Sequence, residues 1–324
     1  MGYAMAATKP GGSDVLRKIE LGALTPAAGE VLIRHDAIGI NFLDIYIRKG
    51  AYPWPVESDL VLGSEGAGVV EAVGSDVQGL AVGDRVGYTL ANGAYATHRL
   101  IDAGYVVKLP DNVSSELAAS IMLKGLTVAY LIHDSFKVEA GHTVLFHAAA
   151  GGVGLIAGQW LNALGATVIG TAGGTDKCAL AKANGYHHVI DYKSADFEAE
   201  VMKLTDGKGV DVTYDSVGND TMARSLTSTR RHGTIIAFGQ SSGPYLDFKI
   251  TDLAKGSYKL SRPTLFHFAG ERDWLEANAA KLFTAVTDGT VTISINQKFA
   301  LEDVAKAHDA LTGRATTGCT ILTV

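Results

Sequence analysis

The sequence predicts an α/β protein in which a doubly wound parallel sheet is inserted into a second domain of antiparallel β structure. Short apolar runs alternate with amphipathic stretches from Thr143 onward, whereas no helix of any length is expected before about Ser114. A chain of 324 residues is long enough for two domains, each with its own core. The expected divisions are 1–123, 124–263 and 264–324, with the last segment returning to complete the first domain.

Five short apolar runs in the central segment predict the strands of the parallel sheet. They are Thr143–His147, Thr167–Thr171, His188–Asp191, Val210–Tyr214 and Thr234–Phe238. A helix whose apolar face carries Ile156 and Trp160 follows the first strand and stops at Gly165, and a second helix is expected from about Asp176 to Ala183. Strand and helix in repeated alternation indicate a parallel sheet with right-handed crossovers.

The two ends of the chain predict the second domain. Glu30–Ile38 and Gly66–Val73 are strand-like and are separated by turn clusters, which is typical of antiparallel structure. The tail predicts a helix over 273–288, a strand over 293–299, a helix over 301–311 and a strand over 319–323. We expect this tail to fold back onto the N-terminal strands.

Charge and composition argue against several classes of function. The net charge is -6 and no basic stripe occurs, so nucleic-acid binding is not expected. No uninterrupted apolar run approaches the length of a membrane span, and the N-terminus lacks the pattern of a secretory signal. Only two cysteines occur, Cys178 and Cys319, which favours a reducing cytoplasm over a disulfide framework.

A glycine-rich turn follows the first central strand. In Ala148-Ala-Ala-Gly-Gly-Val-Gly154, Ala149, Gly151 and Gly154 take the three glycine positions of the dinucleotide fingerprint. Gly151 lets the backbone approach a diphosphate, and Gly154 lets helix and strand pack closely. Gly152 and Val153 open a helix whose N-terminal amides attract phosphate. Alanine at the first position departs from the pattern.

The end of the second central strand selects between dinucleotides. An NAD site needs a carboxylate there to hold the ribose diol, but the strand ends on Ala172-Gly173. Asp176 comes too late and is expected to cap the next helix. Lys177 and Tyr192 supply a charge and a hydroxyl suited to a 2′-phosphate, so the predicted cofactor is NADPH.

Several further motifs resemble the medium-chain dehydrogenase/reductases. These are Gly63-Ser-Glu-Gly-Ala-Gly68, Gly83-Asp-Arg-Val86 and Lys124-Gly-Leu-Thr127. Asn41-Phe-Leu-Asp-Ile-Tyr-Ile-Arg48, Asp215-Ser-Val-Gly218 and Arg314-Ala-Thr-Thr-Gly-Cys319 resemble its quinone oxidoreductase branch, which includes zeta-crystallin. The resemblance runs from about Gly11 to Val324 and implies a Rossmann domain inserted into a GroES-like β domain, with the cofactor in the cleft between them.

The resemblance also implies roles for individual residues. Asn41 and Tyr46 would line the nicotinamide end, with Lys124, Thr127 and Tyr130 near it; Gly151, Gly152 and Val153 would meet the pyrophosphate; Gly173, Lys177 and Tyr192 would hold the 2′-phosphate; Phe238, Gly239 and Ser241 would pass along the nicotinamide ribose, and Arg314 would close over it. Asn41, Tyr46, Lys124 and Thr127 are the candidate catalytic residues. Tyr46 is equally well explained as a packing residue, because it stands at helical spacing from Phe42.

No metal is expected. Zinc-dependent relatives carry a cysteine where Asn41 stands and a histidine where Ser64 stands, and the region 88–98 lacks their cysteine-rich lobe. Alcohol oxidation would then lack its Lewis acid, whereas a quinone is electrophilic enough to be reduced without one.

Three functions therefore remain open. The first is reduction of a quinone by NADPH, and the second is reduction of an activated C=C bond in alkenals or enones by the same cofactor. The third is a non-catalytic role as a crystallin-like or RNA-binding protein. A homodimer is also expected, through an outer strand in the region 257–262.

Overall fold

The computed structural model describes residues 2–52 and 54–324, which form two compact units. Unit 1 comprises the chain up to Leu126 together with Phe266–Thr287 and Ile293–Val324, and unit 2 comprises Thr127–Leu265 with Asp288–Thr292. The sequence predicted divisions after residues 123 and 263. These lie three residues before the division at Leu126 and two residues before that at Leu265. The short segment at 288–292 differs from the expectation, because it groups with unit 2 rather than with the return segment. The side chain of Gln159 explains this, since it bonds both the N–H and the C=O of Thr292.

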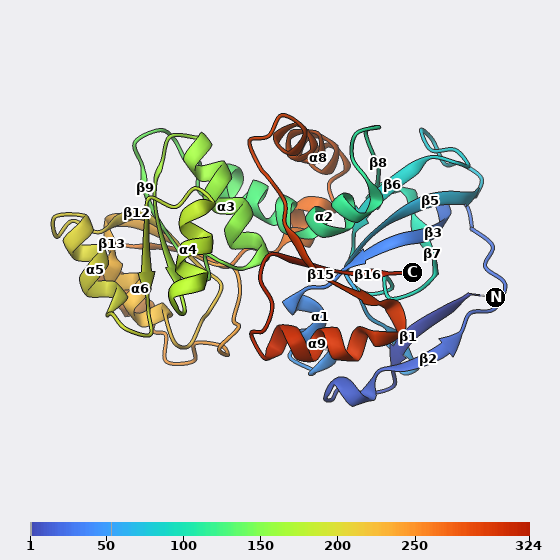
Figure 1. Ribbon diagram of the computed structural model, residues 1–324, viewed down its shortest axis with the longest axis horizontal. Coiled ribbons are helices and arrows are strands. Elements are labelled where there is room, and N and C mark those ends of the chain that lie inside the picture. The colour runs from blue at the N-terminus through green and yellow to red at the C-terminus, as the bar shows by residue number, and fades with distance from the viewer. Residues whose placement is uncertain (1, 53) are drawn as a thin grey trace. The chain divides into compact units, whose positions relative to one another are not determined.

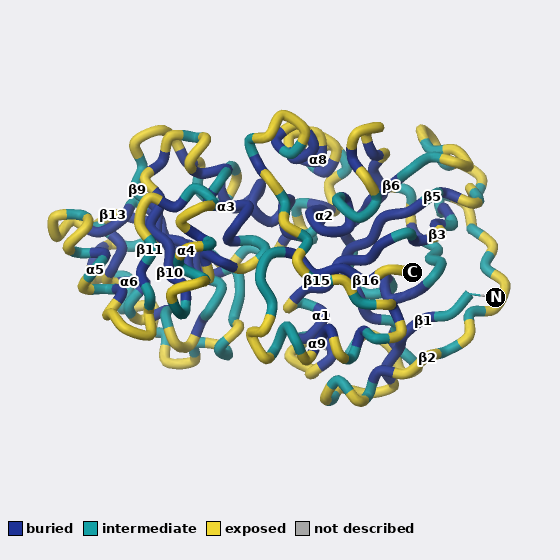
Figure 2. Tube along the Cα trace, viewed as in Figure 1, coloured by how far each residue is buried: buried dark blue, intermediate teal, exposed yellow. Residues whose placement is uncertain are grey.

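Unit 2 is built on a six-stranded parallel sheet (Figure 1). The strand order is β11 (His188–Asp191), β10 (Thr167–Ala172), β9 (Thr143–Phe146), β12 (Val210–Asp215), β13 (Thr229–Ala237) and β14 (Lys259–Ser261). The helices packed around it are α3 (Gly152–Ala163), α4 (Thr175–Ala183), α5 (Phe197–Leu204) and α6 (Met222–Ser228). The central strands of the sheet are largely buried while the outer helix faces are exposed, as Figure 2 shows. The predicted doubly wound sheet is confirmed, and four of its five predicted strands match within one residue at each end.

The fifth strand is the exception. β13 begins at Thr229, five residues before the expected Thr234, because Thr229, the first residue of the polar run Thr229-Arg-Arg-His-Gly233, already pairs with Val210 of β12. The left-handed His232 (φ 63°) lies within this run. A register shift between Val210 and Val212 of β12 accommodates it.

Unit 1 is built on a largely antiparallel seven-stranded sheet. Its path is β15 (Ile295–Ala300), β16 (Cys319–Thr323), β3 (Glu30–Gly39), β5 (Glu65–Val73), β6 (Arg85–Thr89) and β8 (Val106–Lys108), and β7 (His98–Asp102) pairs with β3. A smaller sheet joins β2 (Arg17–Glu20), β1 (Tyr3–Ala7) and β4 (Leu60–Val61). The C-terminal strand β16 pairs with β3, so the tail does return to the N-terminal strands as predicted.

One expectation for unit 1 is wrong: a helix does occur well before Ser114. Helix α1 (Phe42–Arg48) is held at its start by Asp44, which accepts a hydrogen bond from the backbone N–H of Asn41 at 2.9 Å. The remaining helices are α2 (Ser115–Ala129), α7 (Leu265–Ala269), α8 (Arg272–Thr287) and α9 (Val304–Thr312), with a π-helical turn η3 (Tyr130–Ser135) and 3-10 turns η1 (Ser13–Val15), η2 (Ala103–Tyr105), η4 (Ile250–Lys255) and η5 (Leu301–Asp303).

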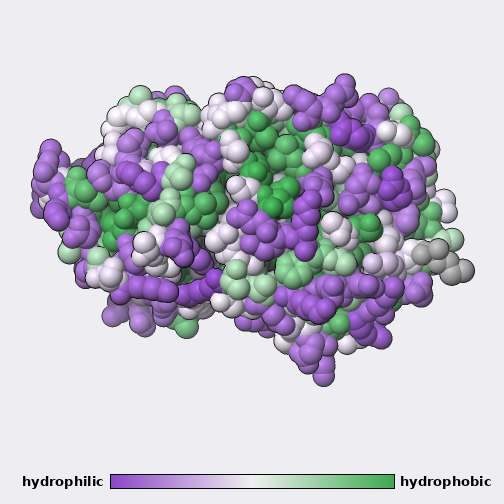
Figure 3. All heavy atoms as spheres, in the orientation of Figure 1, coloured by the Kyte–Doolittle hydropathy of each residue, from purple (hydrophilic) through white to green (hydrophobic). Residues whose placement is uncertain are grey.

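The stretch Ser115–Ser135, which joins α2 to η3, is by length and composition alone able to cross a membrane. Its most apolar window is 83% buried, however, which is typical of the core helix of a globular fold. The molecular face drawn in Figure 3 is covered mainly by hydrophilic side chains, with hydrophobic ones in patches between them.

Candidate functional site

The glycine turn of unit 2 leaves open space at one position and none at the other. A methyl group on Gly154 would lie 2.4 Å from the carbonyl oxygen of Ala148, so this glycine is required for close packing of α3 on β9. A methyl group on Gly151 would meet only that same oxygen, at 3.2 Å. Gly151 is exposed and is the N-cap of α3, where free backbone N–H groups gather. The turn thus leaves room for an anion beside the backbone N–H groups at the start of α3.

Alanine at the start of this turn has a conformational cost. Ala148 has φ 56°, in the left-handed region that glycine adopts readily and alanine does not. Ala149, at the first glycine position, is buried and its N–H donates to the carbonyl of Thr171 at 2.9 Å. The turn is therefore made despite the two alanines, with the strain located at Ala148.

The expected 2′-phosphate residues meet at the ends of β10 and β11. These strands are paired so that Ala172 lies beside Asp191, which brings Gly173 and Tyr192 together as the chain leaves the sheet. A methyl group on Gly173 would lie 2.5 Å from the hydroxyl oxygen of Tyr192. Glycine is needed here so that the phenol can approach the backbone.

One acidic group near this corner is already engaged. Asp191 accepts hydrogen bonds from the backbone N–H groups of Gly174 (2.9 Å) and Lys193 (3.0 Å), which lower the pKa of its carboxyl group. The expectation that Asp176 caps α4 is wrong: the N-cap is Gly174, with φ 98°, and Asp176 lies in the first turn. Lys177 lies in the same turn, half-buried.

A second cation at this corner, Lys193, was missed in the sequence. A methyl group on Gly174 would lie 3.9 Å from its Nζ atom. Its position two residues after β11, next to Tyr192, was the available signal. The corner therefore carries one lysine from α4 and one from the loop after β11, which suits a dianionic phosphate.

The loop after β12 is shaped by Asp215. One of its carboxylate oxygens accepts from the backbone N–H groups of Val217 and Gly218 and from the hydroxyl of Thr221, and the other from the hydroxyl of Ser225. This loop packs against the segment that contains Gly239, where a methyl group would lie 2.6 Å from the carbonyl oxygen of Ser216. Phe238 and Ser241 flank Gly239 just beyond the end of β13.

His147, which directly follows β9, belongs to the same buried network. Its Nδ1 lies 2.9 Å from the hydroxyl of Thr171 and its Nε2 lies 3.0 Å from that of Ser225. Burial lowers the pKa of His147, although the nearby Asp215 opposes the shift. A neutral imidazole thus ties β9 to β10 and α6.

Unit 2 brings its candidate residues to one edge of the sheet. The glycine turn follows β9, Gly173 follows β10, Tyr192 follows β11 and Phe238 follows β13, all at carboxyl ends of parallel strands. This is the edge at which doubly wound sheets bind ligands.

In unit 1, Asn41 and Lys124 meet on a buried carboxylate. Glu65 Oε1 accepts hydrogen bonds from Asn41 Nδ2 at 2.9 Å and from Lys124 Nζ at 2.5 Å. Its Oε2 accepts from the backbone N–H of Leu123 at 2.7 Å. Burial alone would lower the pKa of Lys124, but Glu65, Cys319 and Asp44 together outweigh this effect and raise that pKa. Glu65 was missed in the sequence, where it was noted only as part of a glycine-rich motif.

A second buried carboxylate, Asp44, holds the start of α1. It accepts from Ser64 Oγ at 2.6 Å and from the hydroxyl of Tyr95 at 2.9 Å, besides the N–H of Asn41. Burial raises the pKa of Asp44 to about 6, although these three donors oppose the shift. The carboxylate therefore fixes the backbone from which the Asn41 side chain projects.

The remaining expected residues lie in α1, α2, η3 and the segment after α9. Tyr46 is half-buried in α1 and its ring lies 6.1 Å from that of Phe42, which agrees with the packing interpretation. Thr127 is buried three residues after Lys124 in α2, and Tyr130 is buried at the start of η3. Arg314 is exposed just after α9 with φ 57°.

The positions that hold zinc ligands in zinc-dependent relatives carry other chemistry here. Asn41 donates to Glu65 and Ser64 donates to Asp44, so both are committed to hydrogen bonds. Among residues 2–52 and 54–324, no group of three or more His, Cys, Asp or Glu side chains is arranged to hold a metal ion.

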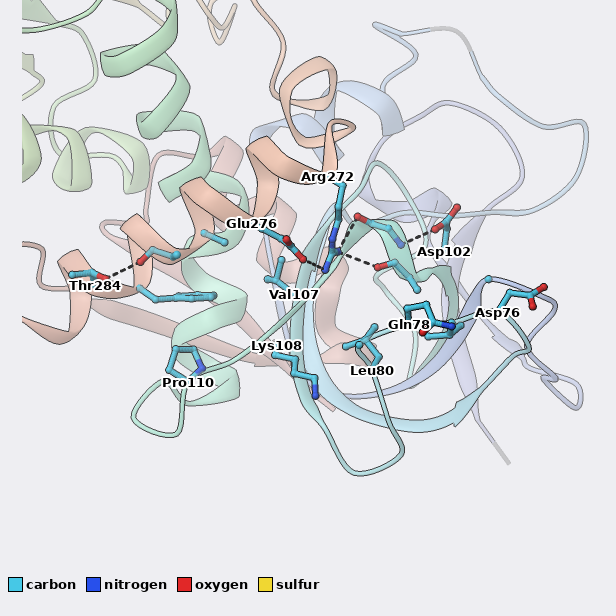
Figure 4. Close-up of a pocket in the computed structure, with 18 of the residues that line it drawn as sticks. Asp76, Gln78, Leu80, Asp102, Val107, Lys108, Pro110, Arg272, Glu276 and Thr284 are labelled. Atoms are coloured by element: carbon cyan, nitrogen blue, oxygen red, sulfur yellow. Dashed lines mark hydrogen bonds and ion pairs between the residues drawn. The ribbon is translucent and has the colours of Figure 1, made fainter.

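A cavity of about 950 Å³ lies elsewhere in unit 1, between α8 and the loops near β8 (Figure 4). Both of its basic side chains are already paired. Arg272 donates to the carbonyl oxygens of Ala103, Gly104 and Val106 and contacts Glu276. Lys108 pairs with Asp84 at 2.7 Å. None of the expected site residues lines this cavity.

Two family models match the chain. The model of the alcohol dehydrogenase GroES-like domain matches residues 27–111, and that of zinc-binding dehydrogenases matches residues 152–280. The first match lies in unit 1; the second begins at the start of α3 and runs through the parallel sheet of unit 2 into α8. The predicted combination of a GroES-like with a Rossmann domain is confirmed.

Individual relatives are similar over nearly their whole length. A quinone oxidoreductase of Pseudomonas aeruginosa is 45% identical over 96% of both chains, and a 2-haloacrylate reductase of a Burkholderia species is 41% identical over 97% of this chain and 96% of its own. The crystal structure of an Escherichia coli quinone oxidoreductase complexed with NADPH superposes with a TM-score of 0.97 at 41% identity, covering 99% of this chain and 100% of that one. This chain therefore belongs to the quinone oxidoreductase family of the medium-chain dehydrogenase/reductases.

Proposed function

We propose that this protein reduces quinones with NADPH. The observation that carries the proposal is the sheet edge of unit 2, where an open glycine turn stands beside a corner that holds Lys177, Lys193 and Tyr192. Asp191, the acidic residue at that corner, is occupied by backbone donors. The NADPH complex of the Escherichia coli relative supports the same cofactor.

The residues of unit 2 would hold NADPH along this edge. Gly151, Gly152 and Val153 would bind the diphosphate at the N-terminus of α3, and Gly173, Lys177 and Tyr192 the 2′-phosphate. Phe238, Gly239 and Ser241, with Tyr130, would contact the nicotinamide riboside, and Arg314 would contribute from unit 1. When bound, NADPH supplies the hydride.

The residues of unit 1 would receive the charge that develops on a quinone oxygen. Asn41 Nδ2 and Lys124 Nζ both donate to Glu65, and each retains at least one further N–H bond. Donors fixed in advance stabilise an oxyanion without reorganisation. Tyr46, together with Thr127 of unit 2, would position the acceptor, and the Lys124 ammonium can provide the proton that completes a hydroquinone.

The test is a steady-state screen of the purified protein with NADPH and NADH against 1,4-benzoquinone and a naphthoquinone. Turnover with NADPH and a much weaker response to NADH are expected. Equal turnover with both nucleotides would contradict the cofactor assignment. Binding of NADPH with no turnover of any electrophile would contradict the enzymatic one and favour a non-catalytic role.

Reduction of an activated C=C bond is the second candidate. The 41% identity to a 2-haloacrylate reductase favours it, because that relative is similar over nearly the whole chain. The chemistry requires the same cofactor and the same donors beside a developing negative charge. A higher kcat/KM for a 2-alkenal or 2-haloacrylate than for any quinone would make this the main activity.

We also infer a homodimer in the cytoplasm. β14 lies at the edge of the six-stranded sheet, and the preceding segment exposes Leu246 (83%) and Ile250 (74%). Pairing of β14 with its copy across a two-fold axis would extend the sheet and cover apolar surface. Cys178 and Cys319 are free thiols, which suits a reducing compartment. Sedimentation as a 33.9 kDa particle would contradict the dimer.

A further inference from the structure

Glu65 is wholly buried, yet its carboxylate organises three donors from two elements. Asn41 Nδ2 and Lys124 Nζ share one oxygen, and the backbone N–H of Leu123, in the middle of α2, occupies the other. Lys124 is also buried, with 6% of its surface exposed. A buried pair of this kind contributes little net stability, because desolvation offsets the attraction between the charges. Its geometry must therefore be explained in another way.

The fold makes room for this carboxylate. Gly39 is paired with Glu65 across β3 and β5, and a methyl group on Gly39 would lie 2.2 Å from both Glu65 Oε1 and the carbonyl oxygen of Ala119. Only glycine at this position lets α2 and the Glu65 side chain approach β3 together. The arrangement thus depends on the backbone as well as on the three polar side chains.

One consequence concerns the Asn41 side chain. Because Nδ2 is directed to Glu65, the amide has one orientation, and its Oδ1 and second N–H point elsewhere. A second consequence concerns Lys124: its ammonium donates to Glu65, and this carboxylate favours the protonated form of the amine. Since one oxygen serves both groups, the position of either depends on the same atom.

We propose that Glu65 is a positioning residue, whose shared Oε1 atom fixes the Asn41 amide and the Lys124 ammonium as one unit for the reaction. This inference rests on the proposed function, because it assigns Asn41 and Lys124 to the reacting end of the substrates. Glu65 itself contacts neither cofactor nor quinone in this account. It acts through the two side chains that it holds.

The experiment is a double-mutant cycle between Glu65→Gln and Asn41→Ala, read as kcat and kcat/KM for 1,4-benzoquinone from pH 6 to 10 and as the Kd of NADPH. Glu65→Gln keeps the shape of the side chain but removes its charge. The matched control is Glu116→Gln. Glu116 lies in α2, the helix that carries Lys124, and the substitution breaks its exposed ion pair with Lys298, 2.7 Å away. Thermal unfolding is measured for every variant.

Glu65→Gln is expected to lower kcat on the order of 100-fold, because it loosens two groups at once. The rate should also fall on the alkaline side at a lower pH than in the wild type, since burial without Glu65 favours loss of the Lys124 proton. The double variant should be no slower than the slower of the single variants, as expected for coupled groups. Glu116→Gln should leave all three readouts unchanged.

A Glu65→Gln protein with reduced thermal stability but wild-type kcat and pH profile would overturn the proposal, as would additive effects in the cycle. If Glu65→Gln does not fold, the cycle is made with Glu65→Asp, which keeps the charge but is too short to hold both groups. If the wild-type protein does not turn over quinones, the proposed function is contradicted but the role of Glu65 is not. In that case the Kd of NADPH, measured for all four members of the double-mutant cycle, shows whether Glu65 and Asn41 are coupled.

Discussion

The hydroxyl oxygen of Tyr95 lies 2.8 Å from Nε2 of His308, joining residues 213 positions apart. The Tyr95 hydroxyl donates to Asp44, so it must accept from His308, whose Nε2 therefore carries the proton. His308 Nδ1 can then only accept, and Arg48 donates to it at 3.1 Å. A neutral histidine of one tautomer thus connects α9 to α1, the helix that begins next to Asn41.

Acid should weaken the fold through this histidine. Burial lowers the pKa of His308 to about 3 and that of His35 to about 4, so between those values and about 6.5 the unfolded chain binds a proton at each that the folded chain does not. The free energy of unfolding therefore falls as the pH drops through this window. Asp44 acts in the opposite direction. Burial raises its pKa to about 6, so between about pH 4 and 6 the folded chain binds a proton at Asp44 that the unfolded chain does not, and this partly offsets the loss of stability.

With two histidines and one aspartate acting in opposite directions, the unfolded chain binds one more proton than the folded chain at these three groups. Their net effect on the free energy of unfolding is therefore about 1.4 kcal/mol per pH unit. His308→Gln keeps a donor and an acceptor but does not titrate, so its unfolding free energy should depend on pH less steeply by about that amount. Urea unfolding at pH 4.5, 5.5 and 6.5 measures the slope. Equal slopes for variant and wild type would show that His308 is charged in the folded protein.

The two glycines of the nucleotide turn should respond in opposite ways to alanine. Gly154→Ala places a methyl group 2.4 Å from the Ala148 oxygen and should cost roughly 2 kcal/mol of unfolding free energy or more. Gly151→Ala meets no atom closer than 3.2 Å, so the fold should tolerate it, but the methyl group would hold a diphosphate away.

Calorimetric titration with NADPH and urea unfolding separate the two effects. Gly151→Ala should weaken binding on the order of 10-fold or more at nearly unchanged stability. Wild-type affinity in this variant would mean that the diphosphate lies elsewhere.

Periodicity predicted unit 2 well and unit 1 less completely. Buried parallel strands such as Val210–Asp215 are short continuous apolar runs, which the sequence displays directly. Helix α1 was missed because seven residues between a strand and a loop carry too few turns for a helical period to be recognised. β13 was started too late because its first residues are polar and do not belong to the apolar run that marks the rest of the strand.

The buried polar groups of unit 1 had no comparable signal. Glu65, Asp44, Arg48 and His308 are charged or titratable types that are normally exposed, and their burial depends on partners distant in the chain. Asn41 and Lys124 were identified by family resemblance, whereas the carboxylate that joins them became visible only when β5 was placed against α2.

Replacing Ala148 by glycine should stabilise the protein. A left-handed alanine costs about 1–2 kcal/mol, of which the greater freedom of glycine in the unfolded chain cancels about half. Ala148→Gly should therefore raise the free energy of unfolding by about 0.5–1 kcal/mol, measured by urea titration. Ala150→Gly, in the same turn but without a positive φ, is the control and should not be stabilising.

Lys177 should govern the choice between NADPH and NADH. It lies in the first turn of α4, and a hydrogen bond to a charged phosphate is worth roughly 1.5–3 kcal/mol. Lys177→Ala should weaken NADPH binding by about 10- to 100-fold and leave NADH binding unchanged. Lys203→Ala, on the exposed face of α5, is the matched control. An equal loss for both nucleotides would place Lys177 at the diphosphate instead.

Arg314 should show a conflict between stability and function. It has φ 57° just after α9, where glycine would be unstrained, so Arg314→Gly should leave the free energy of unfolding unchanged or raise it by up to about 1 kcal/mol. If the guanidinium contacts the cofactor, the same variant should raise the KM for NADPH, and Arg314→Lys should restore only part of the loss because lysine lacks the planar fork. A strained backbone retained at a binding residue is expected where the side chain is needed. Urea unfolding and the KM for NADPH, measured for both variants, test the two effects. If Arg314→Gly binds NADPH normally, the strained backbone at Arg314 has no functional reason.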